Sequence, residues 1–351
     1  MVSKKKIAVA IAMTWCGAAA AQSSVTLYGL VDAGVTYTNN GTSNGKSGPT
    51  FQFMSGSSQG DRWGLKGTED LGGGTKALFN LESGYQLSNG QAGQGGKMFG
   101  RSAFVGLSGN WGELTLGRQY DFIGWYLPAY AIGANTPAGL LAWSLPAYAA
   151  GGYSLDNRVW GDWVDNAVKY VSPTFAGFSF GAMYGFGETP GSVAKNSTMN
   201  FVVNYENGPF STSASYYSQR DAVGSGRQTI YIGGAAYNIG KARIFALVSD
   251  VRIHGGTDPR ATTAEVGATY GLTPNLTVGG GYQYQRRNND LGSASQFTAS
   301  LDYALSKRTD VYTVAAYGHD NAFGAQAVAA LGYPSTTSSQ FALRIGMRHK
   351  F

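Results

Sequence analysis

The sequence ends in FALRIGMRHKF, residues 341–351. Phenylalanine, leucine, isoleucine, methionine and histidine occupy one set of alternate positions, while alanine, arginine, glycine and lysine occupy the other. Successive side chains of a β-strand point to opposite faces, so this alternation predicts a strand with one apolar and one polar face. Residues 198–206, 276–285 and 296–305 alternate in a similar way. The chain is therefore predicted to be built from β-strands.

The composition separates the chain from several other protein classes. Charged residues make up 13% of the 351 residues, about half the usual share of a soluble domain. Aromatic residues also make up 13%, which argues against a disordered chain. After position 22 there is no run of about 20 apolar residues that would form a membrane helix. A chain rich in glycine and aromatic residues and poor in charge is typical of a membrane β-barrel.

The first 21 residues are predicted to be a cleaved export signal. A basic segment at 4–6 precedes an apolar segment at 7–15, and three alanines at 19–21 provide the small residues of a cleavage site. The mature chain is then a single barrel domain, residues 22–351. Loss of three lysines lowers the formal net charge from +6 to +3, which does not favour nucleic acid as a partner.

Sixteen amphipathic segments are predicted along the mature chain, most of them long enough to cross a bilayer when tilted. Tight connections such as 207–209 and 239–240 alternate with longer ones. This pattern predicts an all-β fold, an antiparallel transmembrane barrel with both termini on one side. An even number of strands closes such a sheet without a free edge. The Gly/Ser-rich stretch 39–59 is predicted to be a mobile loop.

One connection is much longer than the others. Some forty residues, from Phe122 to about Val164, separate two predicted strands, and a connection of this length is usually functional. A barrel of sixteen strands has an open lumen, so this third outer loop is expected to fold into the pore. Residues 122–155 contain no charged side chain.

Blocks of sequence along the whole mature chain resemble the general porins of β-proteobacteria and Neisseria. These blocks are SSVTLYG at 23–29, RWGLKGTEDLG at 62–72, LGRQYD at 116–121, NAVKY at 166–170 and GMRHKF at 346–351. The resemblance implies a homotrimer in the outer membrane of a Gram-negative bacterium, in contact with lipid and lipopolysaccharide. Each barrel would be a water-filled channel for small hydrophilic solutes, with the third outer loop as its constriction. In such trimers the first five strands and the last typically face the trimer axis.

The chain ends in Phe351, on the apolar face of its last predicted strand. The outer-membrane barrels that this chain resembles end in an aromatic residue that the barrel-assembly machinery recognises. We therefore expect Phe351 to be the assembly signal. The alternative is that Phe351 only completes an aromatic belt at the membrane interface.

Several basic residues are candidates for the pore lining. Arg62 and Lys66 lie on the face opposite a tryptophan and a leucine, so lipid contact by the apolar pair turns both cations toward the lumen. By resemblance, Arg62, Arg101 and Arg158 match an arginine cluster at the constriction. Cations in a narrow channel concentrate anions, so we expect the channel to prefer anions.

Two arginines conflict with the strand alternation. Arg101 and Arg118 both share their parity with outward-facing residues. Arg101 would need a β-bulge, or a position above the membrane, to face the pore. Arg118 is expected to be sheltered in a subunit interface, because contact with lipid is costly. Glu82 and Asp121 are predicted to be carboxylates of the lumen.

The long loop departs from the porins that the chain resembles, in which this loop usually brings acidic residues opposite the arginines. Here it carries aromatic residues instead: Trp125, Tyr126, Tyr130, Trp143 and Tyr148. These side chains either pack the loop onto the barrel wall or line an aromatic constriction. In the second case arginine would hold a carboxylate while an aromatic ring stacks on the solute. The alternative function is therefore a substrate-specific channel for aromatic anions.

Enzymatic function finds little support in the sequence. His254, His319 and His349 lie far apart, without metal-ligand spacing. His319 and Asp320 are adjacent, so on a strand they point to opposite faces and form a poor catalytic dyad. We predict no catalytic residue, no metal site and no cofactor. A structural or adhesive barrel with an occluded lumen is a further alternative, although smaller barrels of that kind need a shorter chain.

Overall fold

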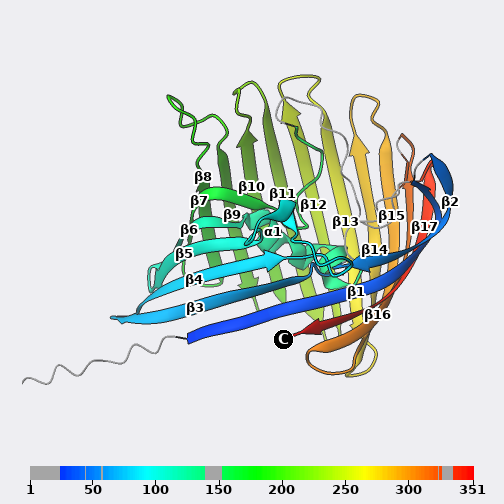
Figure 1. The fold of residues 1–351 in the computed structure, drawn as a ribbon, viewed down its shortest axis with the longest axis horizontal. Helices are drawn as coiled ribbons and strands as arrows, with labels where there is room; N and C mark the ends of the chain where they lie inside the picture. The colour runs from blue at the N-terminus through cyan, green and yellow to red at the C-terminus, as the bar shows by residue number, and fades with distance from the viewer. Residues whose placement is uncertain (1–23, 44, 57, 139–151, 323, 326–334) are drawn as a thin grey trace, which may run out of the picture.

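The computed structural model describes residues 24–351 apart from 44, 57, 139–151, 323 and 326–334, so the predicted export signal at 1–21 lies outside the described residues. In the described part, seventeen strands form one antiparallel sheet that closes on itself where β1 pairs with β17 (Figure 1). The strands are β1 (Ser24–Ser43), β2 (Lys46–Ser55), β3 (Arg62–Gly72), β4 (Thr75–Gly84), β5 (Ser102–Gly109), β6 (Gly112–Tyr120), β7 (Trp163–Val171), β8 (Phe178–Gly185), β9 (Thr198–Asn207), β10 (Phe210–Arg220), β11 (Arg227–Ile239), β12 (Ala242–His254), β13 (Arg260–Gly271), β14 (Leu276–Arg287), β15 (Ser293–Ala304), β16 (Thr309–Asp320) and β17 (Ser339–Lys350).

Two of these strands, β2 and β3, together make one strand of the barrel. Both pair with β1: β3 pairs with the first half of β1, and β2 pairs with the second half of β1. The break between them is held by Asp32, whose carboxylate accepts hydrogen bonds from the N–H groups of Ser58 and Gln59 at 3.2 and 2.7 Å. The barrel therefore has sixteen strands, and the predicted fold class is confirmed.

The prediction of a mobile loop at 39–59 is wrong. β1 runs on to Ser43, and β2 returns beside it as an antiparallel strand. Threonine and serine side chains bond across this hairpin, as between Thr42 and Ser47 at 3.0 Å. The small polar residues that suggested a loop are thus paired in a sheet, because cross-strand contacts outweigh weak intrinsic strand propensity.

The two faces of the sheet differ in polarity. On β15, Phe297 and Leu301 are exposed, whereas Gln296 and Thr298 are buried. Residues of β3, β4, β7 and β17 line one shared cavity, which must lie inside the closed ring. The polar face is therefore the inner one, and the apolar face points outward as in a membrane barrel.

The connections differ between the two ends of the barrel. Phe351 lies next to Gly29, at the end where the connections 208–209 and 240–241 are short. At the other end, β6 and β7 are joined by residues 121–162, which we call the long loop. The described helices are η1 (Gln94–Gly96), α1 (Phe122–Tyr126), η2 (Leu127–Tyr130) and α2 (Ile132–Asn135). None of these helices is long or apolar enough to cross a membrane.

Candidate functional site: an interior cavity and the loop beside it

The long loop is attached to the inner face of strands β9 to β13. Three hydrogen bonds hold it: Phe122 N–H to Asn200 Oδ1 (2.6 Å), Tyr130 Oη to Ser213 Oγ (3.1 Å) and Ile132 N–H to Glu265 Oε2 (3.1 Å). The three partners lie on three strands, and all are buried. The described part of the loop is therefore held along a stretch of wall rather than at one point.

Glycines in this wall leave room for the side chains of the loop. A Cβ atom at Gly234 would lie 2.5 Å from the Cβ of Tyr130, and one at Gly181 would lie 2.4 Å from the Phe122 ring. Distances this short are sterically forbidden, so a larger residue at either position would displace the loop. The wall of β8 and β11 is thus shaped to receive it.

Arg158 closes the base of the long loop. Its Nε lies 2.8 Å from a carboxylate oxygen of Asp121, and its Nη1 lies 3.1 Å from Asp162, so it joins the first residue of the loop to the last. Its guanidinium lies 4.4 Å from the centre of the Tyr217 ring. Burial by itself lowers the pKa of Arg158, but Tyr217, Asp121 and Asp162 raise that pKa above its ordinary value, so the group is charged.

Asp121 belongs to this cluster of Arg158, Asp121 and Asp162, which we call the clamp of the long loop. It is fully buried, and it caps α1 by accepting a hydrogen bond from the N–H of Gly124 at 2.6 Å. Neither Asp121 nor Arg158 is among the residues that line the interior cavity. Their charges are paired with each other, and both side chains form contacts within the loop.

A cavity of about 1400 Å³ lies between the long loop and strands β1, β3 to β7, β15 and β17. Six cationic side chains contribute to its lining: Arg62, Lys66, Arg101, Lys169, Arg348 and Lys350. Three carboxylates do so: Glu82, Glu113 and Asp302. The lining therefore carries an excess of positive charge.

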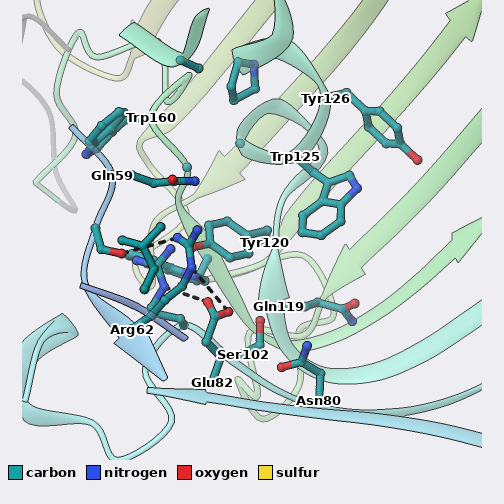
Figure 2. Close-up of a pocket in the computed structure, with 18 of the residues that line it drawn as sticks. Gln59, Arg62, Asn80, Glu82, Ser102, Gln119, Tyr120, Trp125, Tyr126 and Trp160 are labelled. Carbon is teal, nitrogen blue, oxygen red and sulfur yellow. Dashed lines mark hydrogen bonds and ion pairs between the residues drawn. The ribbon is translucent and has the colours of Figure 1, made fainter. Parts of the chain in front are cut away.

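Glu82 lies beside two of the predicted arginines at one side of the cavity, and Figure 2 shows it next to Arg62. Its carboxylate lies 2.7 Å from Arg101 Nε and 3.9 Å from Arg62 Nε, and it accepts a hydrogen bond from the Tyr28 hydroxyl at 2.9 Å. Arg101 lies one residue before β5, so the alternation of that strand does not orient it and no bulge is needed. Its guanidinium lies 5.6 Å from the centre of the Tyr120 ring.

Three lysines of the lining form no ion pair with any described residue. They are Lys66, Lys169 and Lys350. Lys66 was predicted from strand alternation, whereas Lys169 and Lys350 were missed as site residues. The sequence contained an indication for both residues. Lys350 lies on the polar face of the last strand, opposite its apolar face, and Lys169 lies in a sequence block shared with the porins that the chain resembles. These lysines carry the unbalanced charge of the cavity.

Lys169 lies among aromatic residues of the loop. Its Nζ donates a hydrogen bond to the Tyr120 carbonyl at 3.0 Å and lies 4.9 Å from the centre of the Phe122 ring. The centre of the Trp125 ring is 5.7 Å away. Cation–π attraction therefore holds the ammonium group beside the cavity.

The five aromatic residues predicted for the constriction do not share one role. Trp125 and Tyr126 line the cavity (Figure 2), and Trp125 is 63% exposed. Tyr130 is buried against the barrel wall. Trp143 and Tyr148 lie outside the described residues. Of the described members, two thus line the cavity and one packs on the wall, and an aromatic constriction stays a prediction.

Arg118 lies outside the cavity lining and is paired within its own chain. Its Nε donates to the Gly100 carbonyl at 2.8 Å, and it forms an ion pair with Asp165. Asp165 also pairs with Lys97 at 2.8 Å. The Arg118 guanidinium lies 5.5 Å from the centre of the Trp163 ring. A partner from a neighbouring subunit is therefore not needed to shelter Arg118.

Phe351 continues the sheet beyond the end of β17. Its backbone exchanges two hydrogen bonds with Gly29, each of 3.1 Å, and its ring covers Gly29 so closely that a Cβ there would lie 2.2 Å away. The residue is 44% exposed, so part of its surface is open to a partner.

The described ranges contain no group of three or more histidine, cysteine, aspartate or glutamate side chains that would hold a metal ion. The cavity lining combines unbalanced positive charge, neutral polar groups such as Asn80 and Gln119, and aromatic surface (Figure 2). Such a lining can attract anions electrostatically and can contact apolar groups of a solute.

The Gram-negative porin family matches residues 8–322. Outer membrane porin protein 32 of Delftia acidovorans is 32% identical, over 99% of this chain and 100% of the relative. An outer membrane porin protein of Bordetella pertussis is 30% identical, with the same coverage of both chains. The solved structure of an anion-selective porin from Comamonas acidovorans has a TM-score of 0.82 at 30% identity, covering 94% of this chain and 100% of that one.

These relatives are channel proteins rather than enzymes, and they confirm the resemblance read from the sequence blocks. The family match extends over most of the chain, and the closed barrel of sixteen strands agrees with it. The chain belongs to the Gram-negative porins and is an outer-membrane porin.

Proposed function

We propose that this porin is a water-filled channel for passive diffusion of small hydrophilic solutes and that it prefers anions. The observation that carries the proposal is the cavity lining, with six cations against three carboxylates. Lys66, Lys169 and Lys350 form no ion pair with described residues, so their charge attracts counter-ions from solution. The similarity to an anion-selective porin supports the same sign.

In this proposal the long loop narrows the channel. The loop contacts the inner face of β8 to β13, so the solute would pass along the opposite wall. Arg62, Lys66 and Arg101 lie on that wall beside Glu82. Arg158 and Asp121 hold the loop in place, although the sequence suggested that they act on the solute. Solutes would pass between the loop and the charged wall.

Reconstitution of the mature protein tests the channel directly. Addition to a planar bilayer should produce discrete conductance steps whose size rises with salt concentration, because ions cross in water. An occluded barrel would insert without producing steps. That result would contradict the proposed function.

A second candidate function is passage of aromatic carboxylates. Trp125 is 63% exposed on the cavity, and the Lys169 ammonium lies 5.7 Å from its ring centre. A carboxylate would pair with the lysine while its aromatic ring stacks on Trp125. Binding must be weak enough for the solute to leave.

Benzoate tests this second candidate. Benzoate should cause brief, concentration-dependent blocks of single channels, and Trp125→Ala should abolish them. An aliphatic carboxylate of similar size is the matched control and should cause no blocks. If both anions pass equally without blocks, Trp125 has only a packing role.

We also propose that the protein is a homotrimer that the assembly machinery recognises through Phe351. The resemblance supports both statements, and in the porins that the chain resembles the first five strands and the last typically face the trimer axis; their counterparts here are β1 to β6 and β17. Unheated protein in mild detergent should migrate as a trimer, and Phe351→Ala should lower the amount assembled in the outer membrane. A monomer by light scattering in every mild detergent would contradict the first statement. Normal assembly of Phe351→Ala would contradict the second.

A further inference from the structure

The break between β2 and β3 contains more residues than the sheet needs. On the neighbouring β1, Ala33 is the register partner of Ser55, and Leu30 is the register partner of Arg62. A continuous strand would need two residues between Ser55 and Arg62, because each residue of an antiparallel strand lies opposite one partner. The sequence has six. The additional residues must therefore leave the plane of the sheet, as in a large β-bulge.

The additional residues lie on the inner side of the barrel. Ser58, Gln59 and Gly60 all belong to the cavity lining, and we call these three residues the inner step. Figure 2 shows Gln59 on the same side of the cavity as Arg62 and on the opposite side from Trp125 of the long loop. The inner step and the long loop thus approach the cavity from opposite walls.

Asp32 holds the inner step from the adjacent strand. It is fully buried, and one carboxylate oxygen accepts hydrogen bonds from the N–H groups of Ser58 and Gln59 at 3.2 and 2.7 Å. The other oxygen accepts a hydrogen bond from the Tyr312 hydroxyl of β16 at 2.6 Å. A buried carboxylate is costly unless its oxygens are hydrogen-bonded, so burial of Asp32 is coupled to the position of the step.

Asp61 holds the end of the inner step. Its carboxylate accepts hydrogen bonds from the Asp32 N–H and from the Ser55 hydroxyl, both at 2.5 Å. Before the step, Gly56 has a φ of +60°, and its N–H donates to the Asp32 carbonyl at 2.7 Å. A Cβ at Gly56 would lie 2.7 Å from the Asp61 nitrogen, so this turn requires glycine. The chain is thus bonded to Asp32 on both sides of the step.

The inner step lies among three arginines of the cavity lining. The Gln59 side-chain oxygen accepts a hydrogen bond from Arg348 Nη1 at 3.3 Å, and the Gly60 carbonyl accepts one from Arg62 Nη1 at 3.5 Å. A Cβ at Gly60 would lie 3.0 Å from Arg101 Nη1. Carboxylates pair with the same three arginines from other directions. The step therefore supplies the neutral contacts that complete the positioning of these guanidinium groups.

We propose that the inner step is a second constriction element, facing the long loop, and that it determines how large an anion can pass. Passage through a pore depends on its width and on the groups that line it. Gln59 and Gly60 limit the width and position the arginines, and Asp32 and Asp61 hold the step in the lumen. The step carries no charge, so it acts on the size of the anion and not on the sign of selectivity. The proposal rests on the proposed function, because it requires an open anion channel.

The permeability ratio of gluconate to chloride tests the proposal. This ratio follows from the reversal potential of the mature protein in a planar bilayer with potassium gluconate on one side and potassium chloride on the other. Deletion of Gln59 and Gly60 removes most of the step and no charge. The deletion should raise the ratio at least about threefold, because a wider pore admits the larger anion.

Substitutions at Gln59 test width in both directions. Gln59→Ala shortens the side chain and should raise the ratio, whereas Gln59→Trp enlarges it and should lower the ratio. The matched control is Gln91→Ala, at an exposed glutamine outside the cavity lining that accepts a single hydrogen bond, from Asn89 at 3.3 Å. Gln91→Ala should give the wild-type ratio.

Asp32→Ala tests how the step is held. It leaves Gln59 and Gly60 in the chain but removes the acceptor of the two N–H groups, so the ratio should rise as in the deletion. A purely structural role of Asp32 would lower the free energy of unfolding and leave the ratio at its wild-type value.

Several results would overturn the proposal. These are a wild-type ratio in the deletion variant, equal ratios in Gln59→Ala and Gln91→Ala, and shifts of the same sign in Gln59→Ala and Gln59→Trp. If the deletion variant does not give a folded barrel, the two Gln59 substitutions decide. Conductance steps in the wild type with unchanged ratios in every variant would overturn the role of the step alone. Absence of steps in the wild type would overturn the proposed function as well.

Discussion

The two halves of the barrel wall present different chemistry to the interior. Strands β8 to β14 present glycines and buried polar groups, with Gly181 and Gly234 covered by rings of the long loop. Strands β1 and β3 to β7, with β15 and β17, present charged side chains such as Lys66 and Lys169 to the cavity. One half seats the described part of the loop, and in the proposed function the other half meets the solute. The effect of a charge on selectivity therefore depends on which half carries it.

The largest expected effect comes from the charged half. Lys66→Gln/Lys169→Gln/Lys350→Gln should lower the chloride-over-potassium permeability ratio to about one or below, because these lysines carry the unbalanced charge of the cavity. The reversal potential at about 0.1 M salt, where screening is incomplete, measures this ratio. Arg220→Gln/Arg227→Gln/Arg286→Gln removes the same charge from the outer face and should leave the ratio unchanged. Equal shifts in both variants would show that overall charge decides selectivity.

Changes in the clamp of the long loop should lower the stability of the protein and leave its ion selectivity unchanged. Arg158→Met leaves the buried Asp121 carboxylate without its arginine, which should cost about 3–5 kcal/mol of unfolding free energy. Denaturant titration of the reconstituted barrel measures the loss. Lys97→Met breaks an exposed ion pair with Asp165 and should cost less than about 1 kcal/mol. If Arg158→Met abolished anion preference at unchanged stability, Arg158 would belong to the solute path after all.

A smaller effect is expected in the half that seats the loop. Gly234→Ala places a Cβ 2.5 Å from that of Tyr130, and such overpacking typically costs about 1–3 kcal/mol. The variant should also change single-channel conductance, since the loop must move. Gly233→Ala, one residue away on the outer face, meets its nearest atom at 3.6 Å and is the matched control. Identical conductance in the two variants would show that this contact does not position the loop.

Strand alternation predicted the strands of the barrel, because only apolar side chains face lipid at low cost and this determines which face each residue takes. It gave the sixteen strands and the inward positions of Arg62 and Lys66. Alternation is interrupted in β7, where Asn166 has a φ of +51°, and the inward role of Lys169 was missed there. Composition alone was misleading at 39–59, since Gly/Ser-rich segments also pair when a neighbouring strand is available.

The long loop could not be predicted in the same way, because it has no periodicity. Arg158 was assigned to the constriction by resemblance, but its partners Asp121 and Asp162 come together only when the two ends of the loop meet. Asp121 likewise looked like a pore carboxylate, and it is buried beneath the loop. Contacts of this kind depend on the folded path of the chain, which neither spacing nor composition encodes.

The most direct test of the account is the reversal potential of the wild-type channel in a gradient of potassium chloride centred near 0.1 M, where the Debye length is about 10 Å. The excess of cations in the cavity lining predicts a sign that corresponds to chloride preference, and the preference should weaken as the salt concentration rises. A potential near zero, or one of the sign for potassium preference, would contradict the central claim that the charged half of the wall selects the ion.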